Sequence, residues 1–343
     1  MSLYHEIPFL QNIVLTDLIS NLPVQGSLMG ERLLMPTGEV PTRTVEWEVE
    51  YGGRNIAPIV AYDAQSPLVK HPGLERRTGQ SVDIRQKYAL QEADLLFLRN
   101  PGERESRAGR NIVTKQLARM RANTESRIEK IRWDAVLTGQ HVYSEEVDGQ
   151  QLDLTIDFGV PAAQFVTLTA GAKWDAPTTA TPSADFKNAA KLVRETNGRT
   201  IKWAIMNSNT HDLLDAIDAL TQEFRYVQGA DDLVKSPHVT DVIHNIRIVD
   251  YDEGYKEDVN WTGTFQYYMP DNKVIFFVGP NDGGELFGEM SYAPHMLADG
   301  TVVSGIGAEN WTSPDPTREY IRVACVIMPR LFHPDWFEVL TVA

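Results

Sequence analysis

Residue types able to do chemistry are scattered along this sequence instead of being grouped. No two of its eight histidines stand at metal-ligand spacing on one helix face; they are His5, His71, His141, His211, His238, His244, His295 and His333. The chain has no G-x-x-x-x-G-K-[ST] phosphate loop, no G-x-S-x-G nucleophile elbow and no H-E-x-x-H zinc helix. The pattern predicts no catalytic, cofactor or metal site. An enzyme whose site is assembled from distant acidic and histidine residues is the alternative.

Two short segments resemble ligand-binding loops and are better explained as turns. Gly305-Ile306-Gly307 begins like a dinucleotide loop, but a third glycine and a following helical pattern are missing. The segment Asp250–Gly254 is rich in carboxylates, yet its glycine falls one place early for a calcium loop and no glutamate closes it. We predict a turn at the first segment and a solvated acidic turn at the second.

Composition narrows the class of protein further. Cys325 is the only cysteine, which excludes an intrachain disulfide, and its apolar neighbours predict a buried, unreactive strand thiol. The formal net charge of -15 argues against a protein that reads nucleic-acid sequence. No stretch approaches the ~18 apolar residues of a membrane span, and the first residues lack a signal-type run, so we expect no membrane contact.

The first part of the chain contains a strand followed by a long excursion. Residues 1–40 hold short apolar pieces split by prolines and glycines, which predicts an extended arm lying on another surface. From Arg43 to Tyr51 apolar and polar residues alternate, as in a half-buried strand, and Trp47 and Tyr51 share its apolar face. Regular structure is expected to resume only near Ser81. Because a long structureless loop is unusual inside a compact domain, we expect this excursion to reach a neighbouring molecule.

One long helix is predicted from Glu103 to about Thr138. The segment has no proline, its apolar residues recur at three- and four-residue steps, and Gly139 stands where a helix ends. Between Glu103 and Asp134 there are nine Lys/Arg and five Asp/Glu, a net charge of +4, which leaves -19 for the rest of the chain. This basic face either follows nucleic acid or, as the charge balance favours, pairs with acidic surface on the same fold or on a neighbour.

The remainder mixes strands and helices without regular βα alternation. Strands are predicted at 151–158, 164–168, 201–206, 246–250, 273–278, 320–328 and 336–342, and helices at 185–196 and 208–220. A loop rich in proline, threonine and alanine from Trp174 to Ala184 marks a domain boundary. The order of elements predicts an α+β fold.

Four segments, taken together, carry a family resemblance. They are Arg54–Val60, Ala135–Gly139 with Leu154–Gly159, Met269–Val274, and Asn310–Tyr320 followed by Pro329 and Asp335–Val339. In order and spacing they resemble the lambda-type major capsid family of tailed bacteriophages, major capsid protein E. The first 40 residues match this family only in character.

The resemblance implies a tailed-phage major capsid fold in five parts. They are an N-terminal arm (1–40), an extended loop (41–85), a peripheral domain with the long spine helix (86–183), an axial domain (184–315) and C-terminal strands that return to the core (316–343). Such a subunit self-assembles into hexamers and pentamers of an icosahedral shell around double-stranded DNA, without a cofactor.

The resemblance also implies partners and a location. The expected partners are further copies of the chain, a scaffolding protein, a portal, a decoration protein and packaged DNA bound without sequence preference. No extension precedes the arm, so the scaffolding protein is expected to be a separate chain. The expected location is the virion, after assembly in the host cytoplasm. Another phage structural or adaptor protein is the second alternative function, beside the enzyme.

Inter-subunit contacts are expected along the extended loop, which the resemblance places over the adjacent subunit. The candidates are Trp47, Tyr51, Arg54, Ile56, Pro58 and Lys70. In a single copy Trp47 and Tyr51 are expected to be more exposed than their type warrants, because a neighbour covers them. Lys70 could form an isopeptide link to a neighbour, although a solvated lysine is the favoured interpretation.

Overall fold

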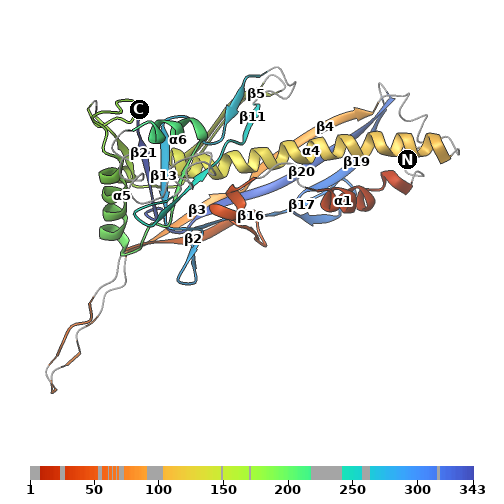
Figure 1. Ribbon diagram of the computed structural model, residues 1–343. Coiled ribbons are helices and arrows are strands. Elements are labelled where there is room, and N and C mark those ends of the chain that lie inside the picture. Colours follow the sequence, from red (N-terminus) through yellow and green to blue (C-terminus); the bar gives the residue numbers. More distant parts are fainter. Residues whose placement is uncertain are drawn as a thin grey trace.

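The molecule has an elongated part and a more compact part, joined by one long helix (Figure 1). The computed structural model describes residues 8–23, 28–52, 56–60, 62–63, 65–66, 68, 73–90, 103–147, 150–169, 171–217, 242–256, 263–314 and 317–343. The elongated part holds α4 (Glu103–Leu137) along a five-stranded sheet. The compact part holds a six-stranded sheet with α5 (Pro182–Asn197) and α6 (Ser208–Asp215). The predicted α+β class is confirmed.

The helix α4 is continuous over 35 residues, which confirms the sequence prediction. Its stripe of Val113, Leu117 and Met120 is buried, as the spacing of these residues requires. The helix ends before Gly139, which has φ +70°, and a Cβ at this position would lie 3.1 Å from Val160 Cβ. Glycine is therefore the residue that this turn accommodates without strain.

The five-stranded sheet runs beside α4. Its order is β1 (Thr37–Glu39), β16 (Gly288–Tyr292), β20 (Thr317–Leu331) and β19 (Gly307–Pro314), and β4 (Val82–Leu90) pairs with β20 along its other edge. Ile321 and Val323 of β20 share a buried cluster with Leu117 of α4. We call the sheet face that carries Ile321 and Val323 the inner face. The opposite, outer face carries the alternate residues, such as Tyr320 and Arg322, because successive strand residues point to opposite sides.

The described residues of the N-terminal segment pack closely on their own chain, so the expectation of an extended arm that lies on another surface is wrong for them. After η1 (Pro8–Leu10), the helix α1 (Asn12–Asn21) buries Leu15 and Ile19 against the inner face and α4. The Thr16 hydroxyl donates to the Ala308 carbonyl of β19 at 2.9 Å, and Arg121 of α4 donates to the Leu22 carbonyl at 2.6 Å. The apolar residues of this segment thus lie on one side of a helix. The prolines and glycines of the segment lie before and after this helix and do not interrupt it.

The six-stranded sheet forms the core of the compact part. Its order is β7 (Phe165–Thr167), β21 (Phe337–Thr341), β13 (Lys273–Phe277), β8 (Trp203–Met206), β10 (Ile246–Asp250) and β9 (Val242–Ile243). Successive residues of β13 pack to opposite sides. The Phe276 ring lies 4.8 Å from that of Phe186 in α5, and the Phe277 ring lies 4.8 Å from that of Phe287. The sheet is therefore buried on both faces.

The two predicted turns have different outcomes. Gly305, with φ +114°, turns the chain between β18 (Val302–Ser304) and β19, as predicted. In the acidic segment, Asp252 accepts the Ser208 backbone N–H at 2.8 Å. It helps to hold the N-terminus of α6, where Asn207 accepts the Thr210 N–H, so this turn is structural and not merely solvated. The helix α6 ends at Asp215, before the predicted Leu220.

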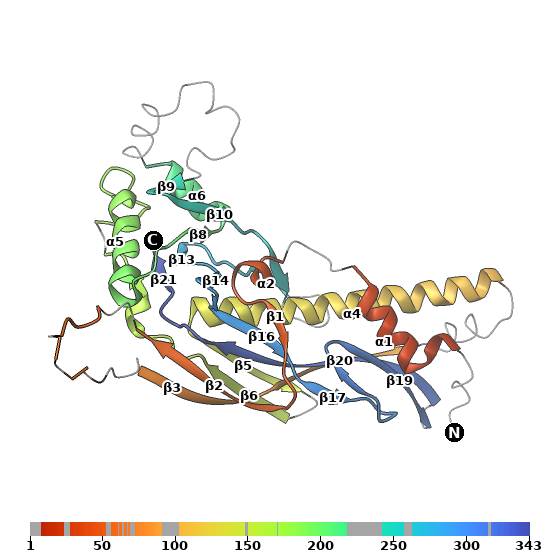
Figure 2. The ribbon, with the colours of Figure 1, turned by 90° about the horizontal axis from the view of Figure 1, so that it is seen from below.

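The remaining described elements are short helices and two-stranded ribbons. The helices are α2 (Gly30–Leu33) and η2 (Ala162–Gln164). The ribbons pair β2 (Thr44–Tyr51) with β3 (Gly73–Gln80), β5 (Gln140–Val147) with β6 (Gln150–Asp157), β11 (Gly254–Lys256) with β12 (Phe265–Tyr267), β14 (Asn281–Asp282) with β15 (Glu285–Leu286), and β17 (Pro294–Met296) with β18. The β2–β3 ribbon leads into a loop that projects from the compact end of the molecule, away from α1, in both views (Figures 1 and 2).

Candidate assembly surfaces

The extended loop has a regular stem. The strands β2 and β3 pair antiparallel from Thr44 opposite Gln80 to Tyr51 opposite Gly73. Regular structure therefore resumes at Gly73 and not near Ser81 as expected, because cross-strand pairing with β2 organises a sequence that has little alternation of its own. Residues 53–72, beyond the stem, are called the loop tip below.

The apolar face of the stem is covered by its own chain. The Trp47 indole N–H donates to the Leu331 carbonyl at 3.1 Å. Val45 packs against a buried cluster that includes Val326 on the outer face of β20. The Tyr51 hydroxyl donates to Glu75 at 3.2 Å, and partial burial raises the pKa of Tyr51. The expectation that Trp47 and Tyr51 are unusually exposed is therefore wrong. Leu331 stands 284 residues after Trp47, so the alternation of residues within the stem carries no information about the strand that covers it.

The loop tip is the opposite case. Large apolar side chains stand almost fully in solvent there: Ile56 is 96% exposed, Ile59 101%, Tyr62 107% and Leu68 95%. Pro58 is exposed as well, while Arg54 and Lys70 lie outside the described residues. Figure 1 shows the loop standing clear of the body. Of the six predicted contact residues, Ile56 and Pro58 thus lie on a surface that a single copy leaves uncovered.

A buried carboxylate joins three parts of the chain. Glu129 of α4 has no exposed surface, and its Oε1 accepts the Gly30 N–H at 2.7 Å, the Trp133 indole N–H at 2.8 Å and the Tyr251 hydroxyl at 2.8 Å. Arg132 lies 3.5 Å from its other oxygen. We call this group the Glu129 junction. It ties α2, α4 and the compact part together.

The sequence analysis missed the Glu129 junction. Its one local signal is a glutamate between Ile128 and Ile131 on the apolar stripe of α4. Burial and the Glu129 carboxylate raise the pKa of Tyr251, which keeps its hydroxyl protonated as a donor. The arrangement is a set of structural hydrogen bonds, since the carboxylate has no solvent access through which a substrate could reach it.

Two further buried carboxyls lie in the compact part. Burial raises the pKa of Asp335 to about 6 and that of Glu338 to about 7. The negative charge of Asp185 adds to the effect on Glu338. Asp335 also accepts a backbone hydrogen bond from Gly52, at the base of the extended loop.

The groups that the enzyme hypothesis would use are not gathered in the described part of the chain. His141 pairs with Asp134 at 2.6 Å, His211 with Asp250 at 2.8 Å, and His244 contacts Ser183 at 2.7 Å, at separate places in the fold. The described residues contain no group of three His, Cys, Asp or Glu that could hold a metal ion. Cys325 is fully buried, and burial raises the pKa of its thiol to about 12, as expected for an unreactive strand cysteine.

Part of the positive charge on α4 is neutralised within the helix. Arg121 pairs with Glu125 at 2.7 Å and Lys130 with Asp134 at 3.2 Å. Arg119 and Lys115 are exposed and have no ion-pair partner among the described residues. None of the helices in the described ranges combines the length and apolar character that crossing a membrane requires.

Comparison with known proteins identifies the family. The model of the family described as phage major capsid protein E matches residues 13–341. The chain belongs to this family. As a member of it, the protein is a capsid-forming structural protein of a bacteriophage virion, and its copies assemble with one another into the shell. No sequence among the curated proteins matches the chain.

Solved structures show the same fold at low sequence identity. A chain assigned as a prophage capsid protein of E. coli CFT073 is 16% identical, with a TM-score of 0.67 over 97% of this chain and 99% of that one. A phage-related protein of Bordetella bronchiseptica RB50 is 13% identical, with a TM-score of 0.56 over 97% and 98%. A chain of the bacteriophage PhiM1 mature capsid is 7% identical, with a TM-score of 0.51 over 94% and 88%. These structures confirm the predicted capsid fold, and the family model confirms the predicted family.

Proposed function

We propose that this family member builds an icosahedral shell of pentamers and hexamers around double-stranded DNA, in which the extended loop of each copy lies on the adjacent copy. Assembly takes place in the host cytoplasm with a separate scaffolding protein and a portal, and a decoration protein then binds the shell. DNA is held without sequence preference. The chain itself catalyses no reaction, which the separate engagement of its described histidines supports.

The exposed loop tip is the observation that carries this proposal. Four large apolar side chains with almost no cover in a single copy are far more than a monomer surface usually presents on one loop. Burying apolar surface contributes roughly 25 cal/mol per Å², so covering this tip supplies several kcal/mol at each contact. The stem, by contrast, is anchored on its own sheet.

A loop deletion separates assembly from folding. Removing residues 54–72 leaves Gly52 and Gly53 between Tyr51 and Gly73, which are opposite one another in the stem. Two glycines are a favourable two-residue hairpin connection, so the stem is expected to survive. A second variant of equal length replaces residues 54–72 with a Gly/Ser linker. It keeps the reach of the loop and removes its apolar side chains, so it shows whether those side chains or only the length of the loop is needed.

Both variants are expected to show native circular dichroism and to stay as small oligomers, whereas the unaltered chain forms closed particles in electron micrographs. Closed shells from either variant would contradict the proposal. Complete unfolding of the linker variant would contradict it too, because the tip would then belong to the core of a single copy.

A further inference from the structure

The outer face of the long sheet carries a cluster of partly exposed aromatic and cationic side chains. Within it, Arg322 also pairs with the buried Glu309. The Trp311 and Tyr320 rings stack with centroids 5.5 Å apart, and the Arg322 guanidinium lies 5.4 Å from the Trp311 centroid. Lys87 of β4 stands opposite Arg322 in the strand register and is exposed, with no ion-pair partner among the described residues. We call these four residues the aromatic patch. Tryptophan, tyrosine and arginine are the residues most enriched at the energetic centres of protein interfaces.

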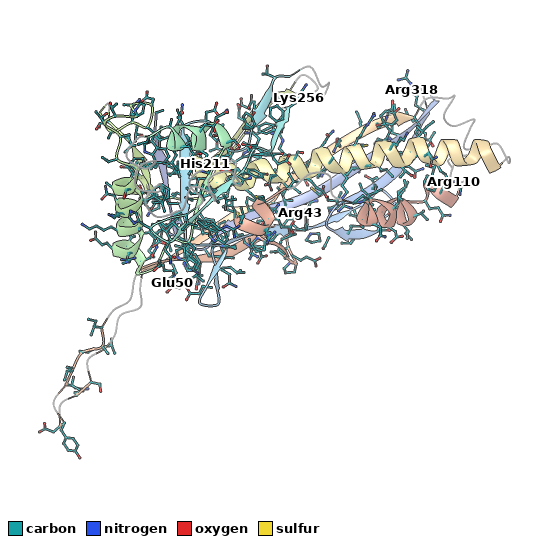
Figure 3. All side chains as sticks on the ribbon, in the orientation of Figure 1. Arg43, Glu50, Arg110, His211, Lys256 and Arg318 are labelled. Carbon is teal, nitrogen blue, oxygen red and sulfur yellow. The ribbon has the colours of Figure 1, made fainter. Side chains whose placement is uncertain are left out.

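The chain's own extended loop leaves the aromatic patch free. The stem covers the other end of the outer face, where Val45 packs against the cluster that includes Val326 and Trp47 reaches Leu331. In Figure 3 Glu50 marks the base of the loop and Arg318 marks the far end of β20, and the loop runs from Glu50 in the direction away from Arg318. A loop that covers the patch must therefore come from a second copy.

The loop tip offers side chains that complement the patch. Tyr62 is 107% exposed, and Asp63 beside it is exposed and is the only acidic residue between positions 53 and 72. A tyrosine ring can stack on the Trp311–Tyr320 pair, and stacked or edge-on aromatic pairs contribute about 0.5–1.5 kcal/mol beyond their buried area. A carboxylate beside it can pair with the free ammonium of Lys87.

The position of the stem decides which face of a neighbour the tip meets. Val45 and Trp47 place the stem on the outer face of the sheet, whereas α1 and α4 occupy the inner face. In a closed shell neighbouring copies are related by rotation within the shell wall, so equivalent faces point to the same side of the wall. A tip that leaves one copy at its outer face therefore reaches the outer face of the next copy, where the aromatic patch lies.

We propose that the Tyr62-Asp63 turn of one copy docks on the aromatic patch of the adjacent copy, with Tyr62 against Trp311 and Tyr320 and with Asp63 paired to Lys87. The proposal deepens the proposed function and rests on it, because it requires that copies lie side by side in a shell. It specifies the receiving surface and the polar contact that fixes the register of the loop.

Cysteine pairs give a direct test. The variant D63C/K87C is assembled, oxidised and run on a non-reducing gel, where docking links copies head to tail into a ladder of covalent multimers. The buried Cys325 adds no background. The matched control is D63C/K115C, since Lys115 is exposed on α4 at the opposite side of the sheet. We expect a ladder from D63C/K87C and monomer from D63C/K115C and from each single variant. A ladder from the control, or none from D63C/K87C in intact shells, would overturn the docking proposal.

A charge exchange supplies a second readout without cysteines. D63K or K87D alone places like charges together and is expected to lower the yield of shells at low salt at least about threefold, while D63K/K87D restores it to within about twofold of the unaltered chain. Failure of the double variant to exceed either single variant would count against the pair. The proposed function stands independently, because unaltered chains that form shells, and 54–72 deletions that do not, support it wherever the tip docks.

Discussion

The Glu129 junction makes a quantitative prediction about stability. In the variant E129A, the Gly30 N–H, the Trp133 indole N–H and the Tyr251 hydroxyl all lose their common acceptor, and Arg132 loses its nearby carboxylate. All of these contacts lie within the buried region around a side chain with no exposed surface. Water can reach the orphaned groups only if the packing opens.

The expected loss follows from the number of donors. Each buried donor left without an acceptor costs about 1–3 kcal/mol, and loss of the carboxylate leaves a buried guanidinium without its counter-charge, which alone costs about 3–5 kcal/mol. Relaxation of the surrounding side chains recovers part of each cost, so we expect E129A to lower the free energy of unfolding by about 4–5 kcal/mol, which is less than the sum of the separate costs. Y251F removes one donor and leaves the others in place, so its loss is expected to be about 2 kcal/mol.

The measurement is urea unfolding followed by tryptophan fluorescence. The 54–72 deletion is the suitable background, since unfolding is then not linked to shell disassembly. K115A on the exposed face of the same helix is the control, with an expected change below about 0.5 kcal/mol. A loss of less than about 1 kcal/mol for E129A would refute the view that the junction holds α2, α4 and the compact part together.

Three further outcomes follow from the geometry. Burial raises the pKa of Glu338 to about 7 and that of Asp335 to about 6, so between about pH 4 and pH 7 the folded chain holds protons that the unfolded chain has released. These two carboxyls should therefore contribute more stability as the pH falls through this window, whereas the lowered pKa values of the buried His295 and His333 act in the opposite direction. E338Q should remove part of the carboxyl contribution at the upper end of the urea-midpoint profile, and a profile that E338Q leaves unchanged would contradict this. Cys325 should resist a thiol reagent at pH 8 until the chain is unfolded in urea, and labelling of the native protein would disprove its burial. G139A should lower the melting temperature through a loss of about 1–2 kcal/mol, because φ is +70° there, and an unchanged melting curve would show that the turn tolerates a side chain.

The local sequence pattern predicted the structure correctly where that structure depends on the segment's own residues. The helix α4 follows from unbroken apolar spacing and a terminal glycine, and β10 begins at Ile246 and ends at Asp250 as predicted. In the same way, the burial of Cys325 follows from the apolar residues on either side of it.

Prediction from the sequence failed where the contacts of a residue come from residues far away in the chain. The strand β19 was missed because its sequence is largely polar, yet Glu309 is buried there beside Arg322 of β20. Trp47 and Tyr51 were expected to need a neighbour, because no local sequence indicates that β20 covers the stem. Of the candidate assembly surfaces, the sequence predicted the loop tip. It could not predict the aromatic patch, because the patch depends on the register between β4, β19 and β20.

The long sheet has a consequence for the order in which the chain becomes competent to assemble. Its central strand, β20, spans Thr317–Leu331, while its partner β4 comes from Val82–Leu90. During synthesis from the N-terminus, the loop tip leaves the ribosome early, but β4 waits for more than two hundred residues until its partner emerges. Under the docking proposal, a chain that ends before β20 can offer a tip and cannot receive one. Under the same proposal, a chain can join a growing shell at both contacts only after β20 has been synthesised and has paired with β4.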